Sequence, residues 1–188
     1  MALIKSISGI RGTIGGKPGE GLSPIDVVTF AAAYGTWLKK KGHPSNSIVL
    51  GRDARISGEM VSSLVANTLI GLGWDVLDIG LSTTPTVELA VPAEKAVGGI
   101  IITASHNPKE WNALKLLNDK GEFISAETGM EILNNADKEA LHFATVENAG
   151  SYTYKPEHAE RHLDAILSYP LVETAEIKNK NFKIVVDA

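Results

Sequence analysis

Short apolar runs alternate with longer amphipathic stretches along most of the chain. The short runs are rich in Val, Ile and Leu and are typical of buried strands, whereas the longer stretches carry apolar residues at helical spacing. Strands are predicted at 3–16 with a turn at 15–16, and at 47–50, 75–79, 97–102, 114–118 and 182–188. Helices are predicted at 24–40, 58–72, 84–92, 125–141 and 156–169, and 142–155 is predicted to be irregular. This order predicts an α/β fold, a three-layer α/β/α sandwich with a mixed, mostly parallel sheet.

The predicted helices have recognisable starts and inner faces. Ser23 can cap the first of them and Pro24 fits the first helical position, while Ser57 can cap the second. The inward residues of the first are predicted to be Ile25, Val28, Ala32, Gly35 and Leu38, and those of the second Met60, Val61, Leu64, Val65 and Leu69. In the last helix, 156–169, the predicted inward residues are Leu163, Ile166 and Leu167.

The apolar run 97–102 stops abruptly at small and polar residues. Asn107 can cap a following helix, Pro108 fits its first position and Glu110 stands where a capping-box acid belongs. Ser105 and His106 are therefore predicted to lie on a turn at the carboxyl end of a strand, where open α/β sheets bind ligands. Free N–H groups at a helix start attract anions, so a serine hydroxyl there is well placed to carry or contact a phosphate.

Composition narrows the class of protein. The chain has 188 residues, enough for one domain with a real core, and a net charge of −4 without a basic block, so nucleic acid is not an evident partner. It has no cysteine, which leaves neither disulfides nor thiolate metal sites. The apolar runs are too short for a signal segment or a membrane span, so a cytoplasmic protein with no membrane partner is expected.

Several segments together resemble one enzyme family. The string T-A-S-H-N-P at 103–108, followed by N-A-L-K at 112–115, resembles the phosphoserine loop of the α-D-phosphohexomutases, which comprise phosphoglucomutases, phosphomannomutases and phosphoglucosamine mutases. Three further segments match: G-I-R-G at 9–12, G-R-D-A-R at 51–55 and T-P at 84–85. The resemblance covers nearly the whole chain, but only the first of the family's four domains.

The resemblance implies an isomerase reaction and a set of site residues. Ser105 would carry a phosphoryl group, pass it to a hexose or hexosamine monophosphate to give a bisphosphate, and take back the other phosphate, which moves phosphate between the 1- and 6-positions. His106 and Lys115 would be its electrostatic and proton-handling neighbours. Arg11, Asn107 and Lys115 would bind the phosphate, and Asn107 would cap the turn rather than react.

The resemblance also implies cofactors and further domains. Mg²⁺ would be held by one phosphate oxygen on Ser105 and by aspartates of a D-G-D-x-D-R loop that this sequence lacks, and a hexose 1,6-bisphosphate would be activator and intermediate. Residues 1–180 would form the first domain and residues 181–188 the first strand of a truncated second one. Domains II–IV of a longer chain are then expected partners, and the fragment alone is expected to be inactive. The exposed last strand could also associate with another copy.

Other interpretations of the same residues remain open. Ser105 and His106 could form a hydrolase nucleophile and its base, although no G-x-S-x-G elbow surrounds the serine. The loop could equally be a capped turn without chemistry, or belong to a non-catalytic phosphosugar-binding or scaffold domain. Arg52, Asp53 and Arg55 could contact a ligand or form an ion-pair lattice that shapes their loop.

Two smaller points concern single positions. His158 and His162 lie four residues apart, a metal-ligand spacing, but pairs of exposed histidines are mostly solvated and no H-E-x-x-H pattern is present. Ala113 stands where the family usually has glycine, and Ala54 where threonine is common. Because alanine disfavours positive φ, the first of these departures bears on the local backbone.

Overall fold

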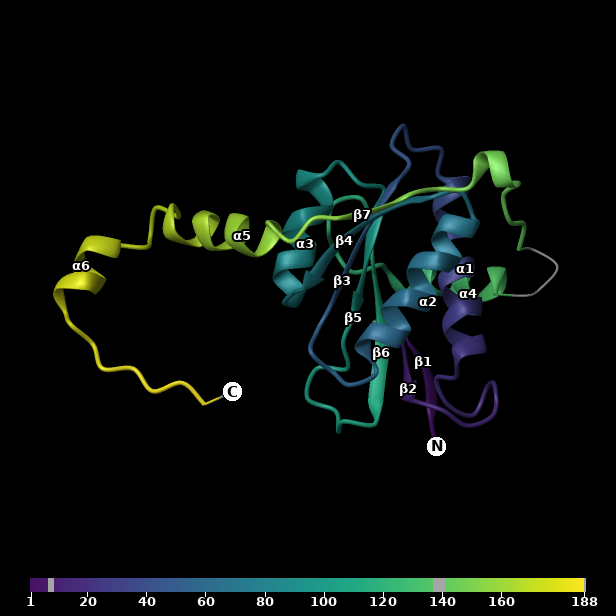
Figure 1. Cartoon of the computed structure of the whole chain (residues 1–188), viewed down its shortest axis with the longest axis horizontal. Coiled ribbons are helices and arrows are strands. Elements are labelled where there is room, and N and C mark those ends of the chain that lie inside the picture. The colour runs from purple at the N-terminus through teal and green to yellow at the C-terminus, as the bar shows by residue number, and fades with distance from the viewer. Residues whose placement is uncertain (7–8, 137–140, 188) are drawn as a thin grey trace.

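A seven-stranded sheet forms the centre of the computed structural model, which describes residues 1–6, 9–136 and 141–187. The strands lie side by side in the order β1-β2-β6-β5-β3-β4-β7 (Figure 1). Their bounds are β1 Leu3–Ser6, β2 Gly9–Thr13, β3 Ser47–Arg52, β4 Asp75–Leu81, β5 Gly98–Ile102, β6 Trp111–Leu117 and β7 Tyr152–Tyr154. β3 pairs in parallel with β4 and β5, and β4 with β7, whereas β1–β2, β2–β6 and β5–β6 are antiparallel. The sheet is therefore mixed, and β2, β3, β4, β5 and β7 share one direction.

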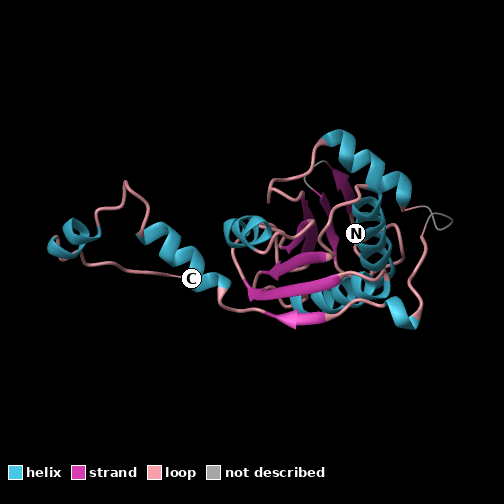
Figure 2. Cartoon of the chain, turned by 90° about the horizontal axis from the view of Figure 1, so that it is seen from above, coloured by secondary structure: helices cyan, strands magenta, loops and turns pink. Residues whose placement is uncertain are grey.

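Helices cover both faces of this sheet. Their bounds are α1 Pro24–Lys40, α2 Gly58–Gly71, α3 Thr84–Ala93, α4 Ala126–Asn135, α5 His158–Leu167 and α6 Thr174–Asn179, with a short 3₁₀ helix, η2, at Val146–Asn148. α1, α2 and α4 lie on one face and α3 on the other (Figure 2). The predicted three-layer α/β/α arrangement is confirmed. No helix in the described part of the chain is both long enough and apolar enough to cross a membrane.

Successive side chains along each strand point to opposite faces of the sheet, and this divides the core into two halves. In β5, Ile100 and Ile102 pack with α1 and α2, whereas Ile101 packs with α3 on the opposite face. A period of two places successive side chains on opposite faces, so a strand covered on both sides is apolar throughout. Tyr34 of α1 ties the layers together, since its buried hydroxyl donates to the carbonyl oxygens of Gly99 (3.2 Å) and Leu117 (2.6 Å). Burial raises the pKa of the Tyr34 hydroxyl above its usual value.

The start of α1 agrees with the prediction, and its inner face agrees in part, since Ala32, Gly35 and Leu38 are buried as predicted. Ser23 Oγ accepts from the Asp26 N–H (3.3 Å) and the Asp26 carboxylate accepts from the Ser23 N–H (3.1 Å), which is a complete capping box. Ile25, predicted to face inward, is exposed, and the buried face instead includes Val27 and Phe30. Because α1 packs against both α2 and α4 as well as the sheet, its buried arc is wider than one stripe.

The second helix also departs from the prediction in detail. Ser57 precedes α2, but its side chain does not cap the helix, and its hydroxyl instead accepts a hydrogen bond from Asn112 Nδ2 (3.0 Å). Met60, predicted to face inward, is exposed, whereas Val61, Val65 and Leu69 are buried as predicted. The serine at this helix start therefore links the loop before α2 to β6 and leaves the helix without a side-chain cap.

The C-terminal part of the chain extends away from the sheet as an arm made of α5, α6 and residues 180–187 (Figure 1). Leu163, Ile166 and Leu167, predicted to face inward, are 59%, 45% and 56% exposed, because α5 packs against α3 and extends away from the sheet (Figure 1). Residues 182–187 pair with no other described strand. The expectation that residues 181–188 open a second domain stays a prediction.

Between the sheet and the arm, the region predicted to be irregular contains two short elements, η2 and the edge strand β7. β7 escapes prediction because it has only three residues, all exposed. The helix predicted at 125–141 is α4, whose last residue is Asn135, and part of its predicted end (137–140) lies outside the described residues.

Polar contacts hold α5 against α3. Glu94, at the end of α3, pairs with Lys155 (2.6 Å), His158 (2.9 Å) and Arg161 (3.2 Å). Burial alone would raise the pKa of the Glu94 carboxyl, but hydrogen bonds from Lys155 and His158, with their positive charge, lower it below its usual value. His162 Nδ1 lies 2.9 Å from Thr86 Oγ1 on α3. The two histidines at metal-ligand spacing are therefore both engaged in attaching the arm.

Candidate active site

Residues 103–110 connect β5 to β6 at the carboxyl end of β5 and form turns. We call them the serine loop. The helix start predicted at Asn107 to Glu110 is wrong. The Asn107 N–H donates to the Ala104 carbonyl (3.0 Å) to close a turn, and the Glu110 carbonyl accepts from the Ile14 N–H (2.8 Å). Trp111 already pairs with Thr13 of β2, so the chain continues directly after the turn as strand β6 and not as a helix.

Ser105 has an uncommon backbone conformation. Its φ is +55°, in the left-handed region that residues other than glycine rarely adopt, and its N–H donates to Thr103 Oγ1 (3.0 Å). The side chain is exposed, and its hydroxyl lies 3.5 Å from His106 Nδ1. That separation is longer than a nucleophile-to-base hydrogen bond of roughly 2.6–3.2 Å. The geometry therefore gives little support to a serine hydrolase.

The predicted site residues gather around one hollow. Ser105, His106, Asn107, Arg11 and Lys115 all line a cavity of about 220 Å³, together with Gly9, Thr103, Ala104 and Ala113. Strand pairing explains the convergence, because Arg11 on β2 lies directly opposite Ala113 on β6, and Lys115 follows two residues later on the same face. Ile10 and Leu114, the alternate residues, are buried under α1. The hollow thus lies on the face opposite α1, beside the serine loop.

The charge of this hollow suits an anion. Arg11 offers a planar fork of N–H donors and Lys115 a compact positive charge, while none of the described lining residues is acidic. Lys115 Nζ lies 5.7 Å from the centre of the Phe123 ring, which is a cation–π contact. A phosphate on Ser105 would carry nearly two negative charges beside these two cations.

Backbone constraints shape the rim of the hollow. Gly9 has φ +116°, and a Cβ there would lie 2.1 Å from the Leu114 carbonyl oxygen, so only glycine fits. Ala113, which replaces the glycine usual in the phosphohexomutases, lies within β6 and has no positive φ. Alanine is therefore compatible with the backbone at this position.

The neighbouring loop, residues 53–57 between β3 and α2, is built around Arg55. Arg55 Nε pairs with Asp53 Oδ2 (3.2 Å), and its two terminal nitrogens donate to main-chain carbonyls of the serine loop and to that of Trp111. Of the two interpretations left open by the sequence, ion-pair lattice or ligand contact, these bonds favour the lattice for Arg55. The sequence singled out the segment but not the partners of this arginine, because its acceptors are backbone atoms about fifty residues away.

Comparison with known proteins decides the family. Residues 3–142 match the family described as phosphoglucomutase/phosphomannomutase, alpha/beta/alpha domain I. The chain belongs to this phosphoglucomutase/phosphomannomutase family. It therefore combines the domain I fold with the family's serine-loop sequence.

Relatives of this phosphoglucomutase/phosphomannomutase domain are much longer than the chain. A phosphoglucomutase/phosphomannomutase of Thermococcus kodakarensis is 34% identical over 178 residues, which is 94% of this chain and 38% of the relative. A phosphoglucosamine/phosphogalactosamine mutase of Sulfurisphaera tokodaii is 32% identical over 191 residues, covering 100% of this chain and 39% of the relative. A crystal structure of a family protein from Burkholderia thailandensis has the same fold, with a TM-score of 0.74 over 87% of this chain and 35% of that one, at 23% identity. The chain thus spans under two fifths of these relatives.

The described part of this domain I does not supply a magnesium site of its own. No group of three or more Asp, Glu, His or Cys side chains in residues 1–6, 9–136 and 141–187 could hold a metal ion. Around Ser105 the charged side chains are cationic, the opposite of the carboxylate set that Mg²⁺ prefers. The residues present therefore do not fit this ion, and we derive no step through it.

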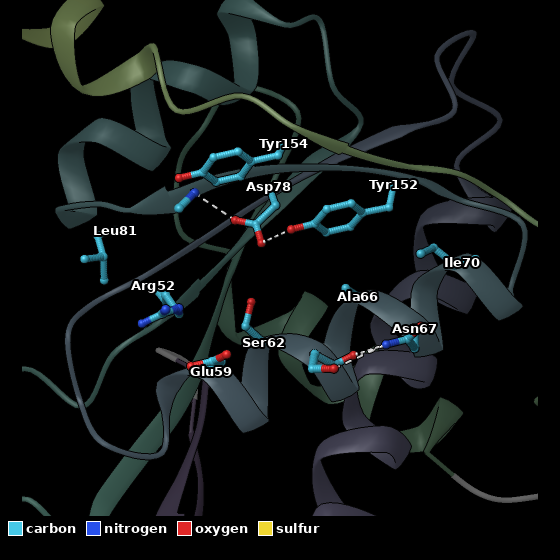
Figure 3. Close-up of a pocket in the computed structure, with 12 residues that line it drawn as sticks. Arg52, Glu59, Ser62, Ala66, Asn67, Ile70, Asp78, Leu81, Tyr152 and Tyr154 are labelled. Carbon is cyan, nitrogen blue, oxygen red and sulfur yellow. Dashed lines mark hydrogen bonds between the residues drawn. The ribbon is translucent and has the colours of Figure 1, made fainter.

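A larger cavity of about 580 Å³ lies elsewhere in the domain, between α2, the strand β4 and the edge strand β7 (Figure 3). Tyr152 donates to Asp78 (2.8 Å), and burial together with that carboxylate raises the pKa of Tyr152 to about 12. Glu59 also lines this cavity, so two acidic groups face it and only Arg52 is cationic. None of the predicted site residues is among those that line it, and a phosphate group fits its charge less well than that of the serine-loop hollow.

Proposed function

We propose that this chain is the phosphoryl-carrying domain of a phosphohexomutase, with Ser105 as the carrier. The observation that supports the proposal most strongly is the convergence of Ser105 with Arg11 and Lys115 around one hollow free of described acidic side chains. The names of the relatives support a hexose or hexosamine phosphate as the substrate class. The overall reaction is an isomerisation in which phosphate moves between the 1- and 6-positions.

In the proposed mechanism two phosphoryl transfers follow each other. First, a free hydroxyl of the sugar monophosphate attacks the phosphorus of phosphorylated Ser105, the bond from Oγ to phosphorus breaks, and a hexose 1,6-bisphosphate forms. The proton of the attacking hydroxyl passes to a neighbouring base, a role we assign to His106, because Lys115 acts here as a cation. Ser105 Oγ then attacks the other phosphate of the bisphosphate, and the proton returns to the sugar oxygen that leaves.

Arg11 and Lys115 act by electrostatics in both steps. Phosphoryl transfer requires positioning and charge stabilisation more than covalent chemistry from the protein. Arg11 would hold phosphate oxygens with its fork, Lys115 would offset the charge of the moving group, and Asn107 would keep the turn in shape.

The proposal includes partners beyond this chain. The proposal includes Mg²⁺ and further domains II–IV, which would supply the carboxylate ligands of the ion and read the sugar. It also includes a hexose 1,6-bisphosphate that primes Ser105. Residues 1–180 would be domain I and residues 181–188 the beginning of domain II. The fragment alone would then be inactive.

The decisive test replaces the carrier hydroxyl. In the natural protein that contains this chain, Ser105→Ala should lower mutase activity about 10³-fold or more, because the step through the covalent intermediate is lost. Intact mass after incubation with a hexose 1,6-bisphosphate should rise by about 80 Da in the wild type and not in the variant. Ser168→Ala, at an exposed serine of the arm, is the matched control and should behave as wild type.

Each alternative predicts a different result. Retained turnover in Ser105→Ala would contradict the mechanism. A wild type that never gains phosphate mass, while inorganic phosphate protects the serine loop from hydrogen exchange, would indicate a non-catalytic phosphosugar-binding or scaffold domain. Covalent labelling of Ser105 by a serine-directed probe would indicate a hydrolase.

A further inference from the structure

All five N–H groups of the Arg55 guanidinium have acceptors, and four of these acceptors are main-chain carbonyls in or next to the serine loop. The bonds run from Nη1 to Pro108 (2.8 Å) and Trp111 (3.0 Å), from Nη2 to Ser105 (2.6 Å) and Asn107 (2.7 Å), and from Nε to the carboxylate of Asp53 (3.2 Å). A side chain so fully engaged has no donor left for a substrate phosphate. Arg55 therefore acts on the loop and not on a ligand.

Arg55 is itself held firmly. Asp53 Oδ1 accepts from the Arg55 N–H (3.1 Å), so one carboxylate holds both the backbone and the side chain of the arginine. The Asp53 N–H in turn donates to the carbonyl of Ile102 at the end of β5 (3.0 Å). Only 12% of the Arg55 side chain is exposed. The two loops that follow β3 and β5, adjacent strands of the sheet, are thus joined through a side chain with little freedom to move.

The bond from Arg55 to the Ser105 carbonyl bears directly on the conformation of the serine. A left-handed backbone is strained at a residue other than glycine and persists only where its surroundings hold it. At Ser105 the preceding peptide is fixed by the bond from the Ser105 N–H to Thr103 Oγ1, and the following peptide by Arg55. Both sides of the strained residue are therefore secured.

The same bonds also orient main-chain donors. In a trans peptide the C=O and N–H point in opposite directions, and no cis bond is found among the described residues. Because the Ser105 and Pro108 carbonyls point to Arg55, the N–H groups of His106 and Lys109 point away from it. Neither N–H donates to another group in the part of the chain that the structure describes. Backbone donors turned outward in this way can bind an anion.

We infer that Arg55 is a positioning residue, which holds Ser105 and the donors beside it in the geometry that phosphoryl transfer needs without touching the substrate. The inference rests on the proposed role of Ser105. Lysine cannot replace this arginine, because a single ammonium with three donors cannot reach four carbonyls spread over seven residues. Arg52, three residues earlier, makes a single side-chain hydrogen bond within the described residues, from Nη1 to the Asp53 carbonyl (3.3 Å), and provides a matched control.

The main test compares Arg55→Lys with Arg52→Lys in the natural protein that contains this chain. Misplacement of a reacting group by about 1 Å can slow a reaction roughly 100-fold. Arg55→Lys should therefore lower kcat about 100-fold and slow the uptake of phosphate by Ser105 from a hexose 1,6-bisphosphate to a similar extent. KM for the sugar phosphate should change less than about threefold, since substrate contacts are kept. Arg52→Lys should leave kcat near wild type.

Chemical rescue and hydrogen exchange separate positioning from general support of the fold. Guanidinium ion added at millimolar concentration should restore part of kcat to Arg55→Ala and not to Arg52→Ala. In this chain without ligand, amide exchange should become faster at residues 103–112 in Arg55→Lys, with exchange in β3 and β5 unchanged. If the Arg55 variants fail to fold, Asp53→Asn provides the test. This change removes the carboxylate charge that holds Arg55 but leaves the four bonds from the guanidinium to carbonyls possible. In that variant kcat should fall several-fold at constant KM.

Some results would overturn the inference. These are wild-type kcat in Arg55→Lys, a raised KM at unchanged kcat, or unchanged exchange in the serine loop. A failure of the proposed function is distinguishable, because wild-type Ser105 would then never take up phosphate. In that case the amide hydrogen exchange measured at residues 103–112 alone supports or refutes the positioning role of Arg55.

Discussion

Helices α1 and α5 both carry apolar residues at helical spacing, yet they have opposite surroundings. In α1, Val27 is fully buried and Phe30 is 3% exposed, whereas in α5 Leu163 and Ile166 are 59% and 45% exposed. α1 lies among the sheet, α2 and α4, whereas α5 packs against α3 and extends away from the sheet (Figure 1). Helical periodicity therefore indicates that a helix has an apolar face, but not whether the same chain covers it.

The nature of the contacts differs as much as their extent. The sheet domain is held by interlocking apolar side chains from strands and helices on two faces. The arm is attached through ionic and hydrogen-bonded pairs centred on Glu94 and Thr86. The stability of the sheet domain should therefore fall when buried side-chain volume is removed, whereas the attachment of the arm should weaken when a charge is removed.

The largest effect is expected in the sheet domain. Ile100 on β5 is fully buried, so Ile100→Ala should lower the free energy of unfolding by about 3–4 kcal/mol through lost burial and a residual cavity. Urea denaturation followed by circular dichroism measures this change. A loss below about 1 kcal/mol would contradict the view that β5 is the centre of the core.

A smaller and local effect is expected where the arm meets α3. Glu94→Gln should detach α5, raising its amide exchange and its cleavage by protease, while the unfolding midpoint of the sheet domain changes little. Hydrogen bonds to charged groups contribute about 1.5–3 kcal/mol each, so the opening free energy of α5 should fall by about that amount. Equal changes in the arm and the sheet would contradict this separation.

The same contact should depend on pH. The pKa of Glu94 is lowered in the folded chain, so its stabilising contribution is present above the usual value near 4.5 and is lost as pH falls through the lowered value. Exchange of α5 should accordingly rise below about pH 4.5 in the wild type. In Glu94→Gln it should already be high at neutral pH and vary less with acidification.

The smallest effect is expected on the exposed face of α5. Ile166→Ala removes the same atoms as Ile100→Ala, but from a side chain that is 45% exposed, and should cost less than about 0.5 kcal/mol in the unfolding free energy of the sheet domain. Comparison of the two isoleucine variants by the same urea titration isolates the effect of burial. A similar loss in both would contradict the distinction between domain and arm.

Much of the fold could be predicted because local signals agreed with the final packing. The Val-, Ile- and Leu-rich runs of β3, β4 and β5 are covered on both faces, and the capping box at Ser23 marks the start of α1. Elements whose form depends on distant partners were missed. β7 is a strand only because β4 offers its edge, and Ile25 is exposed although it fits a helical stripe.

The candidate site shows the same division. The strings at 103–108 and 112–115 singled out Ser105, His106, Asn107 and Lys115, and the separate string at 9–12 singled out Arg11. Strand pairing between β2 and β6 brings Arg11 beside Lys115, and all five residues line the hollow. The helix predicted after Asn107 does not form, because pairing with Thr13 and Ile14 outweighs the local capping signal of Asn107 and Pro108. The role of Arg55 could not be predicted, since its acceptors are carbonyl oxygens that carry no side-chain signature.

The left-handed conformation of Ser105 also restricts which hydroxyl-bearing residue can occupy this position of the turn. Threonine has the same hydroxyl chemistry, but its second branch at Cβ is poorly accommodated at φ +55°. Glycine and asparagine suit that backbone and have no hydroxyl to offer. Of the two aliphatic alcohols among the standard amino acids, steric fit therefore selects the smaller, independently of reactivity.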